Sequence, residues 1–206
     1  MEPAPLHDTA KTGDGAPDDE ALLVAGLGAS AGGVEALEAF FAGLPEIDGV
    51  AFVVILHLAP DEESRLADLL QATLPLPVTQ VTEAVTIERG HVYVIPPGKN
   101  LLAQGRRLVL EPIEEARVRR RPIDHFFRTL AGAYGERAVG VVLSGTGANG
   151  TVGVRALKEA GGLILAQDPD DAAFDEMPRS AIASGVVDMV GPAGALAAEV
   201  VAYAHR

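Results

Sequence analysis

The feature of this sequence that most constrains its fold is a repeated order of short apolar run, glycine-rich turn and segment of helical periodicity. The first unit has a predicted buried strand at 22–25, a turn at 26–33 and a predicted helix at 34–44. A second apolar run at 51–56 is almost wholly hydrophobic, as expected of a parallel strand that is covered on both faces. Alternation of this kind is typical of an α/β domain.

The alternation is interrupted once, in the middle of the chain. After a predicted helix at 65–74, short alternating segments suggest an antiparallel excursion, and the last two of them are joined around Gly105. These segments are 77–81, 85–87, 91–95, 101–103 and 107–110. Further helices are predicted at 123–134, 151–160, 178–184 and 193–203, and further strands at 139–143, 163–166 and 186–190. We therefore expect an α/β fold with a doubly wound, mostly parallel sheet flanked by helices and an antiparallel hairpin excursion.

Composition limits the classes of function that remain. The 206 residues, 48% of them hydrophobic, are enough for one domain with a sizeable core. The chain has 29 acidic and 16 basic residues, and its net charge of -13 removes any general attraction to nucleic acid or to an anionic membrane. The lack of cysteine excludes disulfides, thiolate metal sites and cysteine nucleophiles. With no long apolar run and no signal-peptide pattern, we expect a cytoplasmic protein without membrane insertion.

The first 20 residues differ in composition from the rest of the chain. They hold six acidic residues, three prolines, two glycines and a single base, Lys11, which is the composition of a disordered acidic tail. Their charge of -5 leaves -8 of the total -13 for residues 21–206. We expect this second part to form the folded domain.

Two glycine-rich loops each follow a predicted strand and precede a predicted helix. The second loop, 145–150, has the spacing G-x-G-x-x-G, and Asp168 follows the next predicted strand about 20 residues further on. Dinucleotide-binding folds have this spacing, with the acidic residue on the ribose of the cofactor. A dinucleotide-binding domain is therefore one interpretation of the chain.

The first loop allows a different chemistry. Residues 28–32 form G-x-S-x-G, in which small neighbours let the chain turn sharply and present Ser30 as a nucleophile. The Ala31 amide and the N-terminus of the following helix would then face the oxyanion that forms on attack. A serine needs a base, and His57, at the end of the second apolar run, is the candidate.

The position of these residues supports the same interpretation. The ends of parallel strands meet at one edge of an open sheet, so we expect Ser30, His57 and the loop 144–150 to lie together. The alternative is that the first loop is only a glycine-rich turn and that His57 is a structural histidine.

Seven of the sixteen basic residues fall in one stretch of the sequence. They are Arg106, Arg107, Arg117, Arg119, Arg120, Arg121 and Arg128. Such a cluster forms either a solvated face or a surface for docking a partner. Because no aromatic residue lies between Arg106 and Arg121 and the rest of the domain is acidic, we do not expect nucleic-acid binding. The histidines and the acidic residues of 168–175 lack the spacing of a metal site, so we expect no metal.

Six motifs occur in order between about residue 22 and the carboxyl end. They are GASAGG at 28–33, the apolar run ending in His57, VYVIPPG at 92–98, RPID at 121–124, LSGTG at 143–147 and MPR at 177–179. Together they resemble the catalytic domain of chemotaxis protein-glutamate methylesterases, the CheB family. The resemblance implies hydrolysis of γ-glutamyl methyl esters on methylated chemoreceptors and, in some members, deamidation of receptor glutamines. It implies neither a metal nor a cofactor.

The resemblance also implies roles for single residues. Ser30 matches the family's serine and His57 its histidine, while 145–147 matches the loop that contributes a backbone amide to the oxyanion hole. That amide would be the one of Thr146, with Gly147 beside it. Receptor helices around methylation sites are rich in glutamate, so the arginines at 117, 119, 120 and 121 are candidates for receptor docking by charge.

One position departs from the family pattern, because Asn149 stands where the family has its catalytic aspartate. Aspartate would hold the histidine tautomer and stabilise the imidazolium, and the same exchange in a serine protease lowers kcat about 10⁴-fold. Neither Asp124 nor Asp168 stands at the family position. Asn149 therefore belongs to a natural member with weakened hydrolysis, such as a receptor-binding or signalling relative, to a deliberately substituted protein, or to one in which it deamidates beside the unhindered Gly150.

Overall fold

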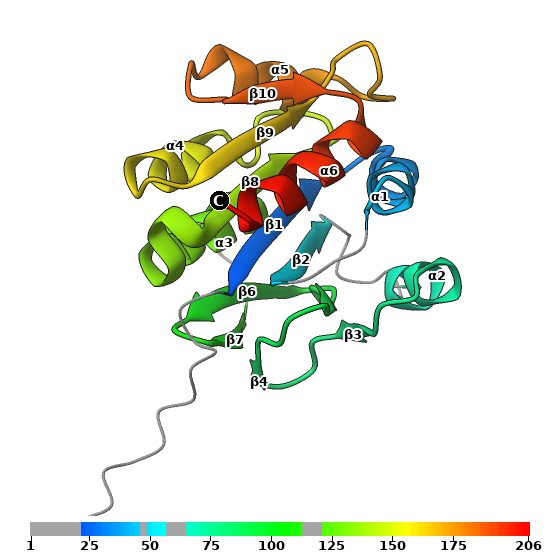
Figure 1. Ribbon diagram of the computed structural model, residues 1–206, viewed down its shortest axis with the longest axis vertical. Helices are drawn as coiled ribbons and strands as arrows, with labels where there is room; N and C mark the ends of the chain where they lie inside the picture. The colour runs from blue at the N-terminus through cyan, green and yellow to red at the C-terminus, as the bar shows by residue number, and fades with distance from the viewer. Residues whose placement is uncertain (1–21, 46–48, 57–64, 113–120) are drawn as a thin grey trace, which may run out of the picture.

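The computed structural model describes residues 22–45, 49–56, 65–112 and 121–206. Its centre is a seven-stranded sheet in the order β10-β9-β8-β1-β2-β5-β3, in which all neighbouring strands are parallel. These strands are β1 (Leu23–Ala29), β2 (Val50–Leu56), β3 (Val78–Gln80), β5 (Val92–Val94), β8 (Ala138–Val142), β9 (Leu163–Gln167) and β10 (Met189–Gly191). A smaller antiparallel sheet has the order β4-β7-β6, with β4 (Val85–Thr86), β6 (Lys99–Gln104) and β7 (Arg107–Pro112). Figure 1 shows this small sheet at one end of the molecule and β10 at the other.

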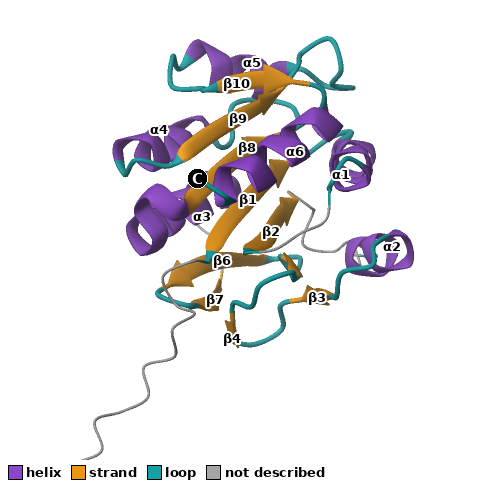
Figure 2. Cartoon of the chain, in the orientation of Figure 1, coloured by secondary structure: helices purple, strands orange, loops and turns teal. Residues whose placement is uncertain are grey.

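Helices cover both faces of the large sheet (Figure 2). One face is covered by α1 (Gly33–Ala42), α2 (Leu66–Thr73) and α6 (Ala193–Ala204). The other is covered by α3 (Pro122–Tyr134), α4 (Thr151–Glu159) and α5 (Glu176–Ala183), together with apolar residues of the small sheet. Every residue of β1, β2, β8 and β9 is buried, as expected of parallel strands between two helical layers. The predicted doubly wound α/β fold with an antiparallel excursion is confirmed.

The first strand is longer than its sequence predicts. A turn is expected from residue 26, whereas β1 continues to Ala29. A Cβ at Gly26 would lie 2.9 Å from a ring carbon of Phe127, and one at Gly28 would lie 2.5 Å from a methyl group of Ile123. These two glycines therefore allow α3 to pass closely over the strand, and the turn itself begins only after them.

The antiparallel excursion is smaller than predicted. Segments 77–81 and 91–95 contribute β3 and β5 to the parallel sheet, where Val78 is level with Val92. Among the strands that the structure describes, only β4, β6 and β7 pair antiparallel. β3 is a three-residue edge strand with one exposed and two half-buried side chains, so its pattern is the same as that of a hairpin strand.

Candidate active site

The candidate active site lies where the carboxyl ends of neighbouring parallel strands meet. β1 pairs with β2 so that Ala29 is level with Leu56, and it pairs with β8 on its other side. Ser30 follows β1 directly, and its amide donates to the carbonyl of Ser144 in the loop after β8, at 2.9 Å. The predicted meeting of Ser30 with this loop is confirmed. His57 is the next residue after Leu56 and lies outside the described residues.

The turn between β1 and α1 presents Ser30 at this edge. The Ser30 carbonyl accepts the Gly33 amide at 2.8 Å, and α1 begins at Gly33. Gly32 has a φ of +66°, and a Cβ there would lie 2.7 Å from the Oγ of Ser144. A side chain at this position would be strained by both the backbone conformation and the contact. This is the strand-turn-helix context that the G-x-S-x-G pattern requires.

Ser144 ties the nucleophile's turn to the loops around it. Its side chain is fully buried, and its hydroxyl donates to the carbonyl of Ala31 at 2.8 Å. The same hydroxyl accepts the amide of Phe174 at 3.0 Å. One side chain thus joins the turn after β1, the loop after β8 and the loop that leads to α5.

A buried amide group supports Ser144 from the next strand. Gln167, at the end of β9, accepts the Ser144 amide through Oε1 at 2.8 Å and donates through Nε2 to Asp171 at 2.8 Å. The Asp171 carboxylate also accepts the amide of Ala193 at the N-terminus of α6, where a negative charge is favourable. No local motif reveals Ser144 and Gln167 as supporting residues, because the bond between them joins positions 23 residues apart.

Of the three predicted oxyanion amides, two are open and one is not. Within the described residues, the amides of Ala31 and Thr146 donate no hydrogen bond. The amide of Gly147 donates to the carboxylate of Glu176 at 2.6 Å. The Gly147 amide is therefore already bonded in this structure, because α5 begins with an acidic residue beside the loop, and its part in the oxyanion site stays a prediction.

Gly145 brings the loop and α5 against the serine. Its amide donates to the Phe174 carbonyl at 3.0 Å, and its own carbonyl accepts the Met177 amide at 2.9 Å. A Cβ at Gly145 would lie 2.9 Å from the Cβ of Ser30 and would also overlap the sulfur of Met177. The backbone that leads to the open Thr146 amide therefore passes directly beside the Ser30 side chain.

Only one half of the Asn149 side-chain amide is satisfied. Its Oδ1 accepts the Asp124 amide at 3.2 Å, in the first turn of α3. Because a backbone N–H needs an acceptor, this bond decides which side-chain atom is oxygen. The Nδ2 is buried and has no partner among the described residues, although buried amide donors are normally paired. The orphaned nitrogen marks where the second oxygen of an aspartate would lie.

The two carboxylates compared above with the family's aspartate, Asp124 and Asp168, make hydrogen bonds elsewhere in the fold. Asp124 is 5% exposed, and its Oδ1 accepts the Gly153 amide at 2.8 Å, which joins α3 to α4. The Nη1 of Arg121 lies 3.5 Å from its Oδ2. Asp168 accepts the amide of Asp170 at 2.9 Å and closes the turn after β9. Both carboxylates therefore serve the local fold.

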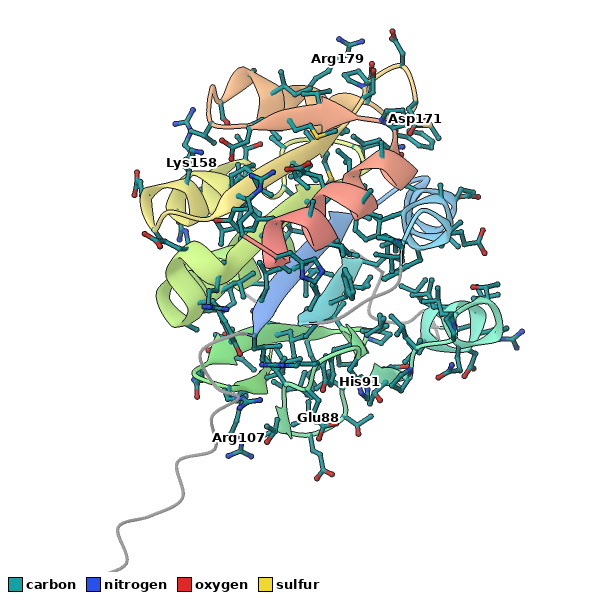
Figure 3. The ribbon with its side chains drawn as sticks, viewed as in Figure 1. Glu88, His91, Arg107, Lys158, Asp171 and Arg179 are labelled. Carbon is teal, nitrogen blue, oxygen red and sulfur yellow. The ribbon has the colours of Figure 1, made fainter. Side chains whose placement is uncertain are left out.

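The predicted docking arginines are only partly described. Arg117, Arg119 and Arg120 lie outside the described residues. Arg121 is exposed and borders α3, and Arg107 lies on β7 in the small sheet (Figure 3).

Two titratable side chains of the described residues, Arg179 and His91, have shifted pKa values. Asp175 bonds the guanidinium of Arg179 at 2.6 Å and raises its pKa, so that Arg179 stays charged. Burial lowers the pKa of His91, while the nearby Glu88 raises it to a lesser extent. His91 precedes β5, at the amino ends of the strands and so at the opposite edge from Ser30. Figure 3 shows His91 and Glu88 close together and far from Arg179.

Within the part of the chain that the structure describes, no group of three or more His, Asp and Glu side chains is placed to hold a metal ion. In the same residues, no helix has the length and apolar character needed to cross a membrane.

Comparisons with known proteins show which family the chain resembles. Residues 25–200 match the family model of the CheB methylesterase. An uncharacterized 104.1 kDa protein of Rhodobacter capsulatus is 48% identical over 60% of this chain and 13% of its own length. A protein-glutamate methylesterase/protein-glutamine glutaminase of Myxococcus xanthus is 34% identical over 91% of this chain and 55% of its own length. The chain thus spans only part of the length of these two relatives.

A solved structure has the same fold. The catalytic domain of the Thermotoga maritima CheB methylesterase matches with a TM-score of 0.79 and 27% identity, over 88% of this chain and 98% of that one. The interpretation of the loop at 145–150 as a dinucleotide site finds no support in these matches.

Proposed function

The chain belongs to the CheB methylesterase family, and on this premise we propose that it hydrolyses γ-glutamyl methyl esters on helices of a methylated chemoreceptor. The observation that carries the proposal is the position of Ser30. It stands on a tight strand-to-helix turn, level with the strand that leads to His57 and beside the open amides of Ala31 and Thr146. The name of the M. xanthus relative supports this substrate class, and also glutamine deamidation by the same site.

In the proposed reaction, Oγ of Ser30 attacks the ester carbonyl carbon while His57 takes the hydroxyl proton. The amides of Ala31 and Thr146 and the N-terminus of α1 stabilise the oxyanion. Collapse of the tetrahedral intermediate expels the methoxy group, which takes the proton from His57 and leaves as methanol. A water molecule, deprotonated by the same histidine, then attacks the acylated serine and releases the glutamate side chain. No metal or cofactor takes part in this scheme.

In this scheme Asn149 is expected to lower the rate of hydrolysis. Because the Asp124 amide holds Oδ1, Nδ2 is the group left to face the histidine. An amide donor facing one imidazole nitrogen selects the tautomer whose other nitrogen already carries a proton. That tautomer cannot accept the proton of Ser30. We therefore expect slow turnover, with the same protein fold and the same nucleophile.

We propose that the arginines at 117, 119, 120 and 121 bind the glutamate-rich receptor helix. The charge of these side chains supports this, since acidic helices and basic clusters attract one another. Charge reversal of Arg119 and Arg120 to Glu should raise KM for the receptor and spare a small ester. An unchanged KM would remove the cluster from the binding surface. A cytoplasmic location, and an acidic tail at 1–20 outside a domain at 21–206, remain predictions.

The proposed function is tested by methanol release from a methylated chemoreceptor. We expect wild-type protein to release methanol above background and Ser30→Ala to fall to background, a loss of about 10²-fold, because losses of residues that act as one catalytic unit are not additive. Ser184→Ala is the matched control, because the Ser184 hydroxyl bonds only backbone groups at the end of α5, the Ala181 carbonyl and the Val186 amide. It should keep the wild-type rate. Methanol release by Ser30→Ala at the wild-type rate would contradict the proposal.

A further inference from the structure

An exposed aromatic ring lies beside the candidate nucleophile. The described residues include four large apolar side chains that are exposed, Leu69, Val152, Phe174 and Val190. Phe174 is the only aromatic one, and it is 46% exposed. A Cβ at Gly32 would lie 3.1 Å from Cδ2 of Phe174, so the ring lies against the turn that presents Ser30.

The backbone of Phe174 is fixed on both sides of this ring. Its amide donates to Ser144 Oγ at 3.0 Å, and its carbonyl accepts the amide of Gly145 at 3.0 Å. Both partners are buried. A residue whose backbone is fixed before binding loses less conformational freedom when a partner covers it, and exposed aromatic residues are frequent contacts at binding surfaces. Phe174 is therefore a candidate contact residue for a binding partner.

The charges around the ring indicate what kind of group covers it. The loop and helix start that carry Phe174 hold five acidic residues, Asp168, Asp170, Asp171, Asp175 and Glu176. Arg179, in the same helix, is paired with Asp175. An anionic side chain is repelled here, whereas an uncharged one is not. Esterification removes the charge of a glutamate, so a methylated helix segment fits this surface better than the demethylated product.

We propose that Phe174 is a specificity residue that contacts an uncharged side chain of the substrate helix, one turn away from the glutamyl methyl ester. The inference rests on the proposed function. On an α-helix, residues three or four positions apart lie on the same face, about 5–6 Å between Cβ atoms. Because the Phe174 ring packs against the turn that carries Ser30, it can contact a side chain three or four positions from the ester while the ester lies at Ser30.

The test compares two substrates, a methylated chemoreceptor and N-acetylglutamate γ-methyl ester, which lacks the helix. For Phe174→Ala we expect the ratio of kcat/KM on the receptor to kcat/KM on the small ester to fall five- to tenfold, through KM. Phe174→Leu should keep most of the ratio, because it keeps most of the apolar surface. Val190→Ala is the matched control, since Val190 is 43% exposed on β10, and its ratio should equal that of wild type.

Two results would overturn the inference. An unchanged ratio would show that the ring does not contact the helix. An equal loss on both substrates would show that the ring only supports the Ser30 turn. Binding separates this inference from the proposed function. In a Ser30→Ala background, Phe174→Ala should raise the Kd for the methylated receptor five- to tenfold, even if no methanol is released by the parent protein. An equal Kd would also overturn it.

Discussion

Ser144 and Asn149 stand in the same loop after β8, yet their surroundings differ. Around Ser144 the amide, the carbonyl and the hydroxyl all have partners, from Gln167, Ser30, Ala31 and Phe174. At Asn149 one oxygen is paired and the buried nitrogen is not. The scaffold that holds the nucleophile is therefore complete, whereas the position expected to orient the base carries a donor with no described acceptor. Mutations at these two residues can therefore separate the positioning of Ser30 from the missing negative charge beside the base.

The largest effect is expected from Asn149→Asp. One carboxylate oxygen would keep the Asp124 amide, which lies at a helix N-terminus and favours a negative charge. The other would replace the orphaned Nδ2 and accept the His57 N–H. We expect kcat for methanol release to rise by about 10² to 10⁴-fold with little change in KM.

Two controls belong to this measurement. Peptide mass mapping must show that wild-type Asn149 has not deamidated, since deamidation would supply the same carboxylate. Asn100→Asp, a partly buried asparagine on β6, should leave kcat unchanged. If Asn149→Asp had the turnover of wild type, the assignment of this position to the base would be wrong.

The next effect is expected from Ser144→Ala. Removal of the hydroxyl leaves the Ala31 carbonyl and the Phe174 amide without their partner in a buried site. We expect a loss of about 1–3 kcal/mol in the free energy of unfolding. We also expect a fall in kcat of about 10- to 100-fold from misplacement of Ser30. Denaturant unfolding and methanol release measure the two effects. Ser184→Ala should change both far less, and equal behaviour of the two variants would remove Ser144 from its positioning role.

A smaller effect is expected at Glu176. Mutation of this residue tests whether the Gly147 amide only supports the loop or also stabilises the oxyanion. Glu176→Gln keeps an acceptor for the Gly147 amide, so turnover should stay within about twofold of wild type. Glu176→Ala loses that bond, and we expect a fall in kcat of about three- to tenfold as the loop after Gly145 loosens. A rise in kcat for Glu176→Ala would mean that Gly147, once released, stabilises the oxyanion after all.

The smallest effect concerns stability alone, at His91. Burial lowers its native pKa below the ordinary 6.5, and its Nε2 lies 2.8 Å from Thr79 Oγ1, with Tyr93 stacked on the ring and Glu88 nearby. As the pH falls, the unfolded chain therefore takes up a proton before the native one. The stabilisation is present above about pH 6.5 and is lost as the pH falls toward the lowered native pKa.

A His91→Gln variant should remove this dependence. Between about pH 7.5 and pH 5.5, the fall in Tm should be smaller for His91→Gln than for wild type, by no more than about 2 °C because His91 is partly exposed. Relative turnover on the small ester should follow wild type at both pH values, since His91 lies at the opposite edge of the sheet. A larger fall in Tm for the variant than for wild type would show that protonation of His91 stabilises the native protein, contrary to this expectation.

Much of the fold follows from the sequence because its signals are local. Apolar runs predict β2, β8 and β9, and the G-x-S-x-G pattern predicts the turn at Ser30. Glycines are ambiguous, however. Gly26 and Gly28 look like turn residues but are needed because Ile123 and Phe127 pack on them from α3. Short strands such as β3 also fail to show whether their partner is parallel or antiparallel.

The site is predicted less completely than the fold, for a related reason. Ser30 can be found because its motif is contiguous. The bonds from Ser144 to Ala31 and from Gly147 to Glu176 join residues 113 and 29 positions apart, so no pattern contains them. Gly147 is a suitable oxyanion donor by motif alone, and only the three-dimensional placement of α5 shows that its amide is already bonded.

The most direct measurement is the rate at which a fluorophosphonate, an electrophile that reacts with activated serines, labels this protein. It needs no receptor, and peptide mapping identifies the labelled residue. We expect a single label on Ser30, no label in Ser30→Ala, and labelling of Asn149→Asp at least about 100-fold faster than of wild type. A label on another residue, or equal rates for wild type and Asn149→Asp, would contradict this expectation.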